Sequence, residues 1–210
     1  MAKRLASSVV LAMALAMAMA VSAQAASDTG NAPPTLSFYS GGGGANAHWQ
    51  NDPNDSPNDD NTQDIEINTS VAPNGFAGVT VHHVAGIPTE AYPNSSFEVK
   101  SNVPAPSVPS LGSPRLVVQF SDGGRGELRP LLNTPEWQEV ADPNWDDNGG
   151  TCGFQFQTSW NNVQACHAGT VVTDVFIATD PYGFTYWIDN LNTAGKVFNE
   201  AADNGGPSGH

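Results

Sequence analysis

VVTDVFIATD, residues 171–180, is followed after a glycine-containing turn by YWIDNL, residues 186–191. The second segment places Tyr186 and Ile188 on alternate positions, with Trp187 between them. A period of two is typical of β-strands that bury one face. The two segments therefore predict a strand, a turn and a strand that close the domain as an antiparallel hairpin.

The same alternation recurs through the chain in short runs divided by Gly, Pro, Asn and Asp. Many short strands separated by such turn residues favour a sandwich or a barrel. We therefore predict an all-β fold, an antiparallel β-sandwich. Its core is expected to contain the alternating apolar residues Ile65, Ile67, Val79, Val81, Phe97, Val99, Val118, Phe120, Phe154, Phe156, Val175, Ile177 and Ile188.

One short helix is expected after the Phe154–Phe156 strand. Thr158 or Ser159 can cap its start, and Trp160 and Val163 share one face. Gly169 lies just past its end, where glycine commonly terminates a helix.

The chain has two cysteines, Cys152 and Cys166. In an exported protein an even pair predicts a disulfide. This bond would close a loop of about fifteen residues and contribute on the order of 3 kcal/mol to stability. Two free buried thiols are the alternative.

The N-terminus has the pattern of a secretory signal peptide. Lys3 and Arg4 precede an apolar run over 9–21, and Ala23-Gln24-Ala25 supplies a small-x-small cleavage site. The run is shorter than the roughly 20 residues that a membrane-spanning helix needs. We predict a signal peptide over 1–25, a flexible leader over 26–34, one β-sandwich domain over 35–200 and a disordered tail over 201–210. The protein is thus expected to be secreted, either extracellular or periplasmic.

The charge balance is strongly acidic, with 7 basic residues, 21 acidic residues and a formal net charge of −14. Nucleic acid and anionic membrane surfaces are disfavoured as partners, because affinity for a polyanion comes from Lys and Arg. Neutral sugars, Ca²⁺ and basic partners remain compatible. Solubility outside the cell also explains the charge without any partner.

The C-terminal stretch resembles the closing strands of jelly-roll carbohydrate-binding modules and related galactose-binding-like domains. The resemblance rests on an aromatic-x-Ile-Asp-Asn pattern, Trp187 to Asn190 with Tyr186 before it, over some forty residues. It implies a jelly-roll-like sandwich, a glycan as ligand and a structural Ca²⁺ held in part by Asp189. Alternatively, Asp189 and Asn190 turn the chain and cap neighbouring backbone groups.

A second calcium hypothesis comes from the acidic loops. Asp142, Asn144 and Asp146 place a side-chain oxygen on alternate residues, and hard cations such as Ca²⁺ take six to eight oxygen ligands. The spacing does not match the helix-loop-helix calcium motif. Solvated acidic loops are the alternative interpretation.

The sequence contains five tryptophans: Trp49, Trp137, Trp145, Trp160 and Trp187. A sugar ring can stack on an exposed indole while Asn, Asp or Gln side chains bind its hydroxyls. Three of them, Trp49, Trp137 and Trp145, lie in or beside loops rich in Asn and Asp. Because Trp187 alternates with Ile188, it faces either another layer or an exposed sheet face. We predict Trp49, Trp137, Trp145 and Trp187 as ligand-binding residues, although a place in the core is the alternative for each.

Motifs for catalysis are sparse in the sequence. It contains no Gly-x-Ser-x-Gly, His-Glu-x-x-His or phosphate-loop pattern. His82 and His83 are adjacent on a predicted strand, so they point to opposite faces. The favoured function is non-catalytic binding of carbohydrate. The alternatives are a structural or surface-matrix protein that contacts other extracellular proteins, and a polysaccharide-acting hydrolase or lyase.

Overall fold

The computed structural model describes residues 32–42, 44–51, 63–69, 75–102, 108–109, 114–181 and 183–204. The predicted signal peptide over 1–25, residues 26–31 of the predicted leader and the acidic loop over 52–62 lie outside these ranges. Within the predicted tail, Ala201–Asn204 form a 3-10 helix, η3, and 205–210 lie outside the description. In the part of the chain that is described, no helix is long and apolar enough to cross a membrane.

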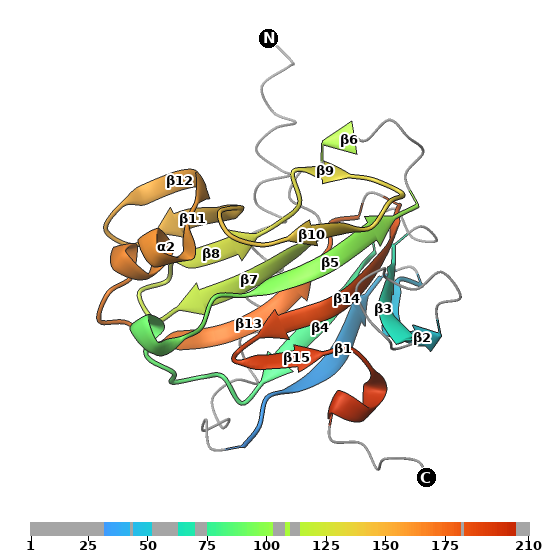
Figure 1. The fold of residues 1–210 in the computed structure, drawn as a ribbon, viewed down its shortest axis with the longest axis horizontal. Coiled ribbons are helices and arrows are strands. Elements are labelled where there is room, and N and C mark those ends of the chain that lie inside the picture. The colour runs from blue at the N-terminus through green and yellow to red at the C-terminus, as the bar shows by residue number, and fades with distance from the viewer. Residues whose placement is uncertain are drawn as a thin grey trace.

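Two antiparallel sheets form a β-sandwich (Figure 1). The seven-stranded sheet contains, in spatial order, β1 (Thr35–Gly41), β4 (Phe76–His82), β13 (Val172–Ala178), β7 (Arg115–Phe120), β8 (Arg125–Leu128), β11 (Trp145–Gly149) and β12 (Gly153–Thr158). The six-stranded sheet contains β10 (Gln138–Val140), β5 (Ser96–Ser101), β14 (Thr185–Thr193), β3 (Gln63–Asn68) and β2 (Asn46–Asn51), with β15 (Lys196–Phe198) also paired to β14. The short strands β6 (Val108–Pro109) and β9 (Leu132–Asn133) pair separately, and a 3-10 helix, η2 (Thr89–Ala91), precedes β5.

The chain crosses repeatedly between the two sheets. Strands β3, β5 and β14 belong to the six-stranded sheet, whereas β4, β7 and β13 belong to the seven-stranded sheet. The late strands insert among the early ones, because β13 lies between β4 and β7 and β14 lies between β5 and β3. This wrapping is jelly-roll-like, and it confirms the predicted antiparallel β-sandwich.

The predicted C-terminal hairpin is wrong in one respect. Its two segments form β13 and β14, but these strands lie in opposite sheets and do not pair with each other. The turn between them carries the chain from one layer to the other. Both strands are central and have a neighbour on each side, which buries more apolar surface than a two-stranded hairpin can.

The core consists largely of the predicted alternating residues. All of the predicted core residues except Phe154 and Phe156 are buried. Those two side chains on β12 are 57% and 64% exposed, which corrects the prediction. The alternation itself holds, but its phase is reversed. Gln155 pairs with Asp147, whose side chain faces the interior, so the two phenylalanines point outward from the last strand of the sheet.

The predicted helix and disulfide are confirmed. Helix α2 spans Trp160–Cys166, and the Ser159 hydroxyl accepts a hydrogen bond from the Asn162 N–H. Trp160, Val163 and Cys166 are buried on its inner face. The end of the helix is bonded to Cys152, with a Cα–Cα separation of 5.3 Å.

Candidate functional site

The outer face of the six-stranded sheet brings together two of the predicted tryptophans. On β14, Ile188 points into the core, and Trp187 therefore points outward, where it is half-buried. Its direct neighbours on this face are Lys100 on β5 and Glu66 on β3. The sequence left two orientations open for Trp187, and the structure places it on the exposed sheet face.

Trp137 lies on the same face, directly before β10. Gln138 pairs with Val99, so the antiparallel register continued by one residue places Trp137 opposite Lys100. The Lys100 ammonium lies 4.5 Å from the centre of the Trp137 ring and 5.5 Å from that of Trp187. These are cation–π distances. The lysine therefore connects two half-exposed indoles on neighbouring parts of one surface.

Carboxylates form a row beside this aromatic pair, two residues further along each strand. Glu139 pairs with Glu98, and Glu98 pairs with Asp189. The β14–β3 register continued by one residue places Asp189 beside Asp64. Asp189, Asp64 and Glu98 are 2%, 2% and 7% exposed, whereas Glu139 is exposed. The face thus presents flat aromatic surface beside a row of carboxylates of which only Glu139 is exposed.

Asp189 also holds its own strand in shape. Its carboxylate accepts a hydrogen bond of 2.7 Å from the Asn190 N–H, and the Asn190 amide donates to Glu98 at 3.2 Å. Asn190 has a φ of 49°, and the β14–β5 register shifts after Asp189. The backbone-capping role that the sequence left open is therefore present in the structure.

The other two predicted ligand-binding tryptophans pack against the core. Trp145 is fully buried, and its indole N–H donates to the Asn94 side chain at 3.0 Å. Trp49 is on the inner side of β2 and packs edge-on against Phe38, with ring centres 6.1 Å apart. Both side chains fill space between the layers, as tryptophan commonly does.

The predicted metal ligands around Asp142 have protein partners. The Asp142 carboxylate accepts from the Trp160 N–H at 2.7 Å and so caps α2. Asp146 pairs with the Arg129 guanidinium at 2.6 Å and accepts from the Gln157 N–H at 3.1 Å. The Asn144 backbone N–H donates to Ala141 in a turn. Asp142 lies in the turn between β10 and β11, and Asp146 lies on β11, in the other sheet from Asp189.

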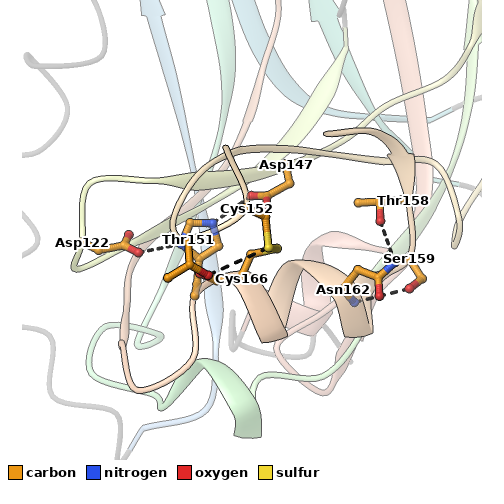
Figure 2. The surroundings of a disulfide bond; sticks show 9 residues. Asp122, Asp147, Thr151, Cys152, Thr158, Ser159, Asn162 and Cys166 are labelled. Carbon is orange, nitrogen blue, oxygen red and sulfur yellow. Dashed lines mark hydrogen bonds and ion pairs between the residues drawn. A yellow bond between two sulfur atoms is a disulfide. The ribbon is translucent and has the colours of Figure 1, made fainter. Parts of the chain in front are cut away.

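Sequence reasoning did not find a buried cluster beside the disulfide (Figure 2). The His167 ring lies between two carboxylates, 2.7 Å from Asp122 and 2.8 Å from Asp147, and stacks on Phe120 with ring centres 4.2 Å apart. The adjacency of Cys166 and His167 in the sequence was the only signal. The imidazole and the Asp147 side chain have no solvent exposure, whereas the Asp122 side chain is 29% exposed.

Burial and hydrogen bonding act differently on the two carboxylates of this cluster. Burial raises the pKa of Asp147 above its usual value, and its hydrogen bond to His167 offsets only part of that. Burial also raises the pKa of Asp122, but hydrogen bonds from His167 and the Gly124 N–H outweigh it and leave that pKa below its usual range. Near this cluster, Asp147, Cys152 and Cys166 place potential metal ligands within 4.8 Å of one another, but both sulfurs are committed to the disulfide.

Neither a family model nor a curated protein matches this chain. Solved structures of carbohydrate-binding modules do match. A family 30 module matches at 12% identity and a TM-score of 0.44, over 85% of this chain and 89% of that chain. The family 11 module of the cellulosomal cellulase Lic26A-Cel5E of Clostridium thermocellum matches at 12% identity and a TM-score of 0.41, over 81% of this chain and 93% of that one. A family 11 module from the same organism was solved in complex with a β-1,3-1,4-mixed-linked tetrasaccharide. It matches at 12% identity and a TM-score of 0.42, over 79% of this chain and 91% of that chain.

Proposed function

We propose that this chain is an exported, non-catalytic carbohydrate-binding domain whose ligand lies on the outer face of the six-stranded sheet. One observation supports this proposal above all others. Trp137 and Trp187, which are far apart in the sequence, lie half-exposed on one sheet face on either side of Lys100. The sandwich core does not require them there, because their inward neighbours Val99 and Ile188 already fill it.

The chemistry of the face suits a sugar. A sugar ring has an apolar C–H face and a rim of hydroxyls, so its site needs flat aromatic surface bordered by polar groups. The indoles supply the first requirement. Lys100 can donate to hydroxyl oxygens, and Glu66 and Glu139 can accept from hydroxyl protons.

The spacing of the indoles favours an oligosaccharide over a single sugar. Trp187 is on β14, and Trp137 directly precedes β10, with β5 between these two strands. Strands two apart in a sheet are separated by roughly 10 Å. A single ring does not cover both indoles, whereas successive units of a chain can stack on one and then the other.

Calcium is a separate proposal for this face. We propose Asp189 as one ligand of a structural Ca²⁺, supported by the hard oxygens of Asp64 and Glu98 beside it on the sheet. Asp142 and Asp146 are left out of this proposal, because their carboxylates already bind backbone and guanidinium groups.

Affinity electrophoresis tests the glycan proposal. The full chain is run in gels containing β-glucan, xylan, mannan or soluble chitin derivatives, and retardation in at least one gel is expected. Trp187→Ala and Trp137→Ala should each weaken that retardation at least about tenfold, the loss typical of a moderately important contact residue. The matched control is Val197→Ala, an exposed apolar side chain on β15 beside the same sheet.

Circular dichroism spectra must show that all three variants keep the fold. If both tryptophan variants bind as the wild type does, the proposed face is wrong. If the wild type binds no polysaccharide but contacts other extracellular proteins, the surface-matrix alternative is favoured. That alternative has one structural observation behind it, the exposed Phe154 and Phe156 on β12.

A further inference from the structure

Strand β12 ends the seven-stranded sheet and pairs on one side with β11. Figure 1 shows it at the end of the sandwich opposite β2 and β3. An edge strand presents backbone N–H and C=O groups to solvent, and natural proteins protect such edges with charged residues, proline or bulges. The segment GFQFQT of β12 contains neither a charged residue nor a proline, in a chain with a net charge of −14. Its pairing with β11 is interrupted by one register shift, between the Trp145–Thr158 and Asp147–Gln155 pairs.

The side chains of this edge are apolar on one face. Phe154 and Phe156 are 57% and 64% exposed and contact each other edge-to-face, with ring centres 4.6 Å apart. The glycan site on the other sheet does not include them. Keeping two large aromatic rings in water has a free-energy cost that a partner at this edge would remove.

We infer that β12 is a homodimer interface, at which two copies of this chain pair through their edge strands. The sequence Phe-Gln-Phe is symmetric about Gln155. Antiparallel pairing on a two-fold axis through Gln155 places Phe154 of each copy opposite Phe156 of the other. Side chains alternate between faces along a strand, so the four phenyl rings form one cluster on one face of the joined sheet.

Local charges permit this approach of two acidic chains. Arg129, whose guanidinium lies 5.7 Å from the Phe156 ring centre, is already paired with Asp146 at 2.6 Å. Arg125 is paired with Glu127 at 2.5 Å, and Asn148, opposite Phe154, is neutral. The surroundings of the edge are therefore neutralised within each copy. The remaining repulsion comes from the overall charge and is screened by salt.

The dimer is expected to be weak. Gly153 and Gln157 have φ angles of 72° and 50°, and these bends restrict regular pairing to the three residues between them. So short an interface falls at the low end of the size range for specific contacts. A two-fold contact uses the same surface patch on both copies, so the assembly ends at a dimer and does not grow into a filament.

The geometry gives the dimer a use that rests on the proposed function. The two-fold axis of an antiparallel strand pair is perpendicular to the sheet, so both copies carry their six-stranded sheets on the same side. The two proposed glycan faces then point in one direction. A polysaccharide surface can engage both, and avidity raises retention without any new contact to sugar.

Sedimentation of the full chain tests the interface directly. The wild type should show a monomer–dimer equilibrium that strengthens with added salt. Phe156→Lys should weaken dimerisation by about 30-fold or more, the effect of a hot-spot residue, because the change occurs twice in each dimer. Val197→Lys is the matched control, since it adds the same charge at an exposed apolar site on β15. Circular dichroism checks that each variant is folded.

A second variant keeps the test independent of folding effects at Phe156. Residues directly opposite in antiparallel strands have Cα atoms about 4.5–5.5 Å apart, within disulfide range. Gln155→Cys should therefore form a covalent dimer with itself under mild oxidation, while Val197→Cys should not. Peptide mapping must show that the new bond joins residue 155 to residue 155 and that Cys152–Cys166 is intact.

Glycan binding separates this inference from the proposed function. Phe156→Lys should lose retention on insoluble polysaccharide but keep the wild-type affinity for a short soluble oligosaccharide, whereas Trp187→Ala should lose both. A monomeric wild type at all protein and salt concentrations would overturn the dimer and leave the glycan site standing. Equal dimerisation of Phe156→Lys and Val197→Lys would also overturn the dimer, and so would assemblies of more than two copies. Assemblies that keep growing with protein concentration would favour the matrix-protein role.

Discussion

Removing the Cys152–Cys166 disulfide should destabilise the fold by an amount that follows from its place in the chain. The two cysteines are 14 residues apart in sequence, so the bond closes a loop of about fifteen residues in the unfolded state. The chain-entropy relation gives about 3 kcal/mol for such a loop. For a chain of this size, that free energy corresponds to a fall in Tm of roughly 6–12 °C.

Cys152→Ala is the cleaner of the two single substitutions. Cys152 is exposed, so its loss removes the covalent link and leaves the core as it is. Cys166 is buried on the inner face of α2, and its replacement would add the cost of a small cavity. We therefore expect Cys152→Ala to lose about 3 kcal/mol and Cys166→Ala to lose more.

Urea denaturation measures both effects, with the reduced wild type as a reference. The Cys152→Ala midpoint should fall and match that of the reduced wild type. A steeper slope of free energy against denaturant would indicate a more expanded unfolded state, which the loop-entropy account itself predicts. A loss below about 1 kcal/mol for Cys152→Ala would refute the loop-closure reasoning, and a native exported protein with two alkylatable thiols would refute the bond itself.

Three further predictions concern pH, calcium and processing. The folded-state pKa of Asp122 lies below its usual value, so its ionised form stabilises the fold at neutral pH, and that stability is lost as pH falls below the ordinary value of about 3.9. Asp122→Asn should therefore show a shallower loss of unfolding free energy than the wild type over the acid range; equal slopes would contradict this. Ca²⁺ should raise the Tm of the wild type relative to a chelator and should not raise the Tm of Asp189→Asn. An unchanged Tm in both proteins would contradict the proposed calcium site. The exported protein should begin at Ala26 on N-terminal sequencing, and an intact Met1 in the secreted fraction would contradict the signal peptide.

Local pattern was sufficient for those parts of the fold that depend on local physics. The two-residue period predicted the strands, and Ser159 predicted the start of α2 because a cap needs only the next turn of helix. The cysteine pair predicted its own bond. None of these inferences required knowledge of which strands are neighbours in space.

Local sequence pattern could not predict how the strands are arranged in space. Alternation defines two faces of a strand but does not say which one is buried, and this is why Phe154 and Phe156 were placed in the core. The hairpin prediction failed for a related reason, since a turn between two strands fits pairing within a sheet as well as a crossing between sheets. His167 gave no usable signal, because Asp122 and Asp147 reach it from different strands and loops.

The candidate site shows both what local pattern can predict and what it cannot. Trp187 could be placed on an exposed face as one of two outcomes, because Ile188 beside it competes for the same core. Its association with Trp137 depends on β5 lying between β10 and β14, a strand order that no local pattern contains. Composition drew attention to the tryptophans as a group, and packing then divided them. Trp145 is fully buried, and Trp49 is half-buried and packs against the core. Trp137 and Trp187 are also half-buried, but they lie on the outer face of the six-stranded sheet. These two half-exposed indoles, each in cation–π contact with Lys100, are the basis of the proposed glycan site.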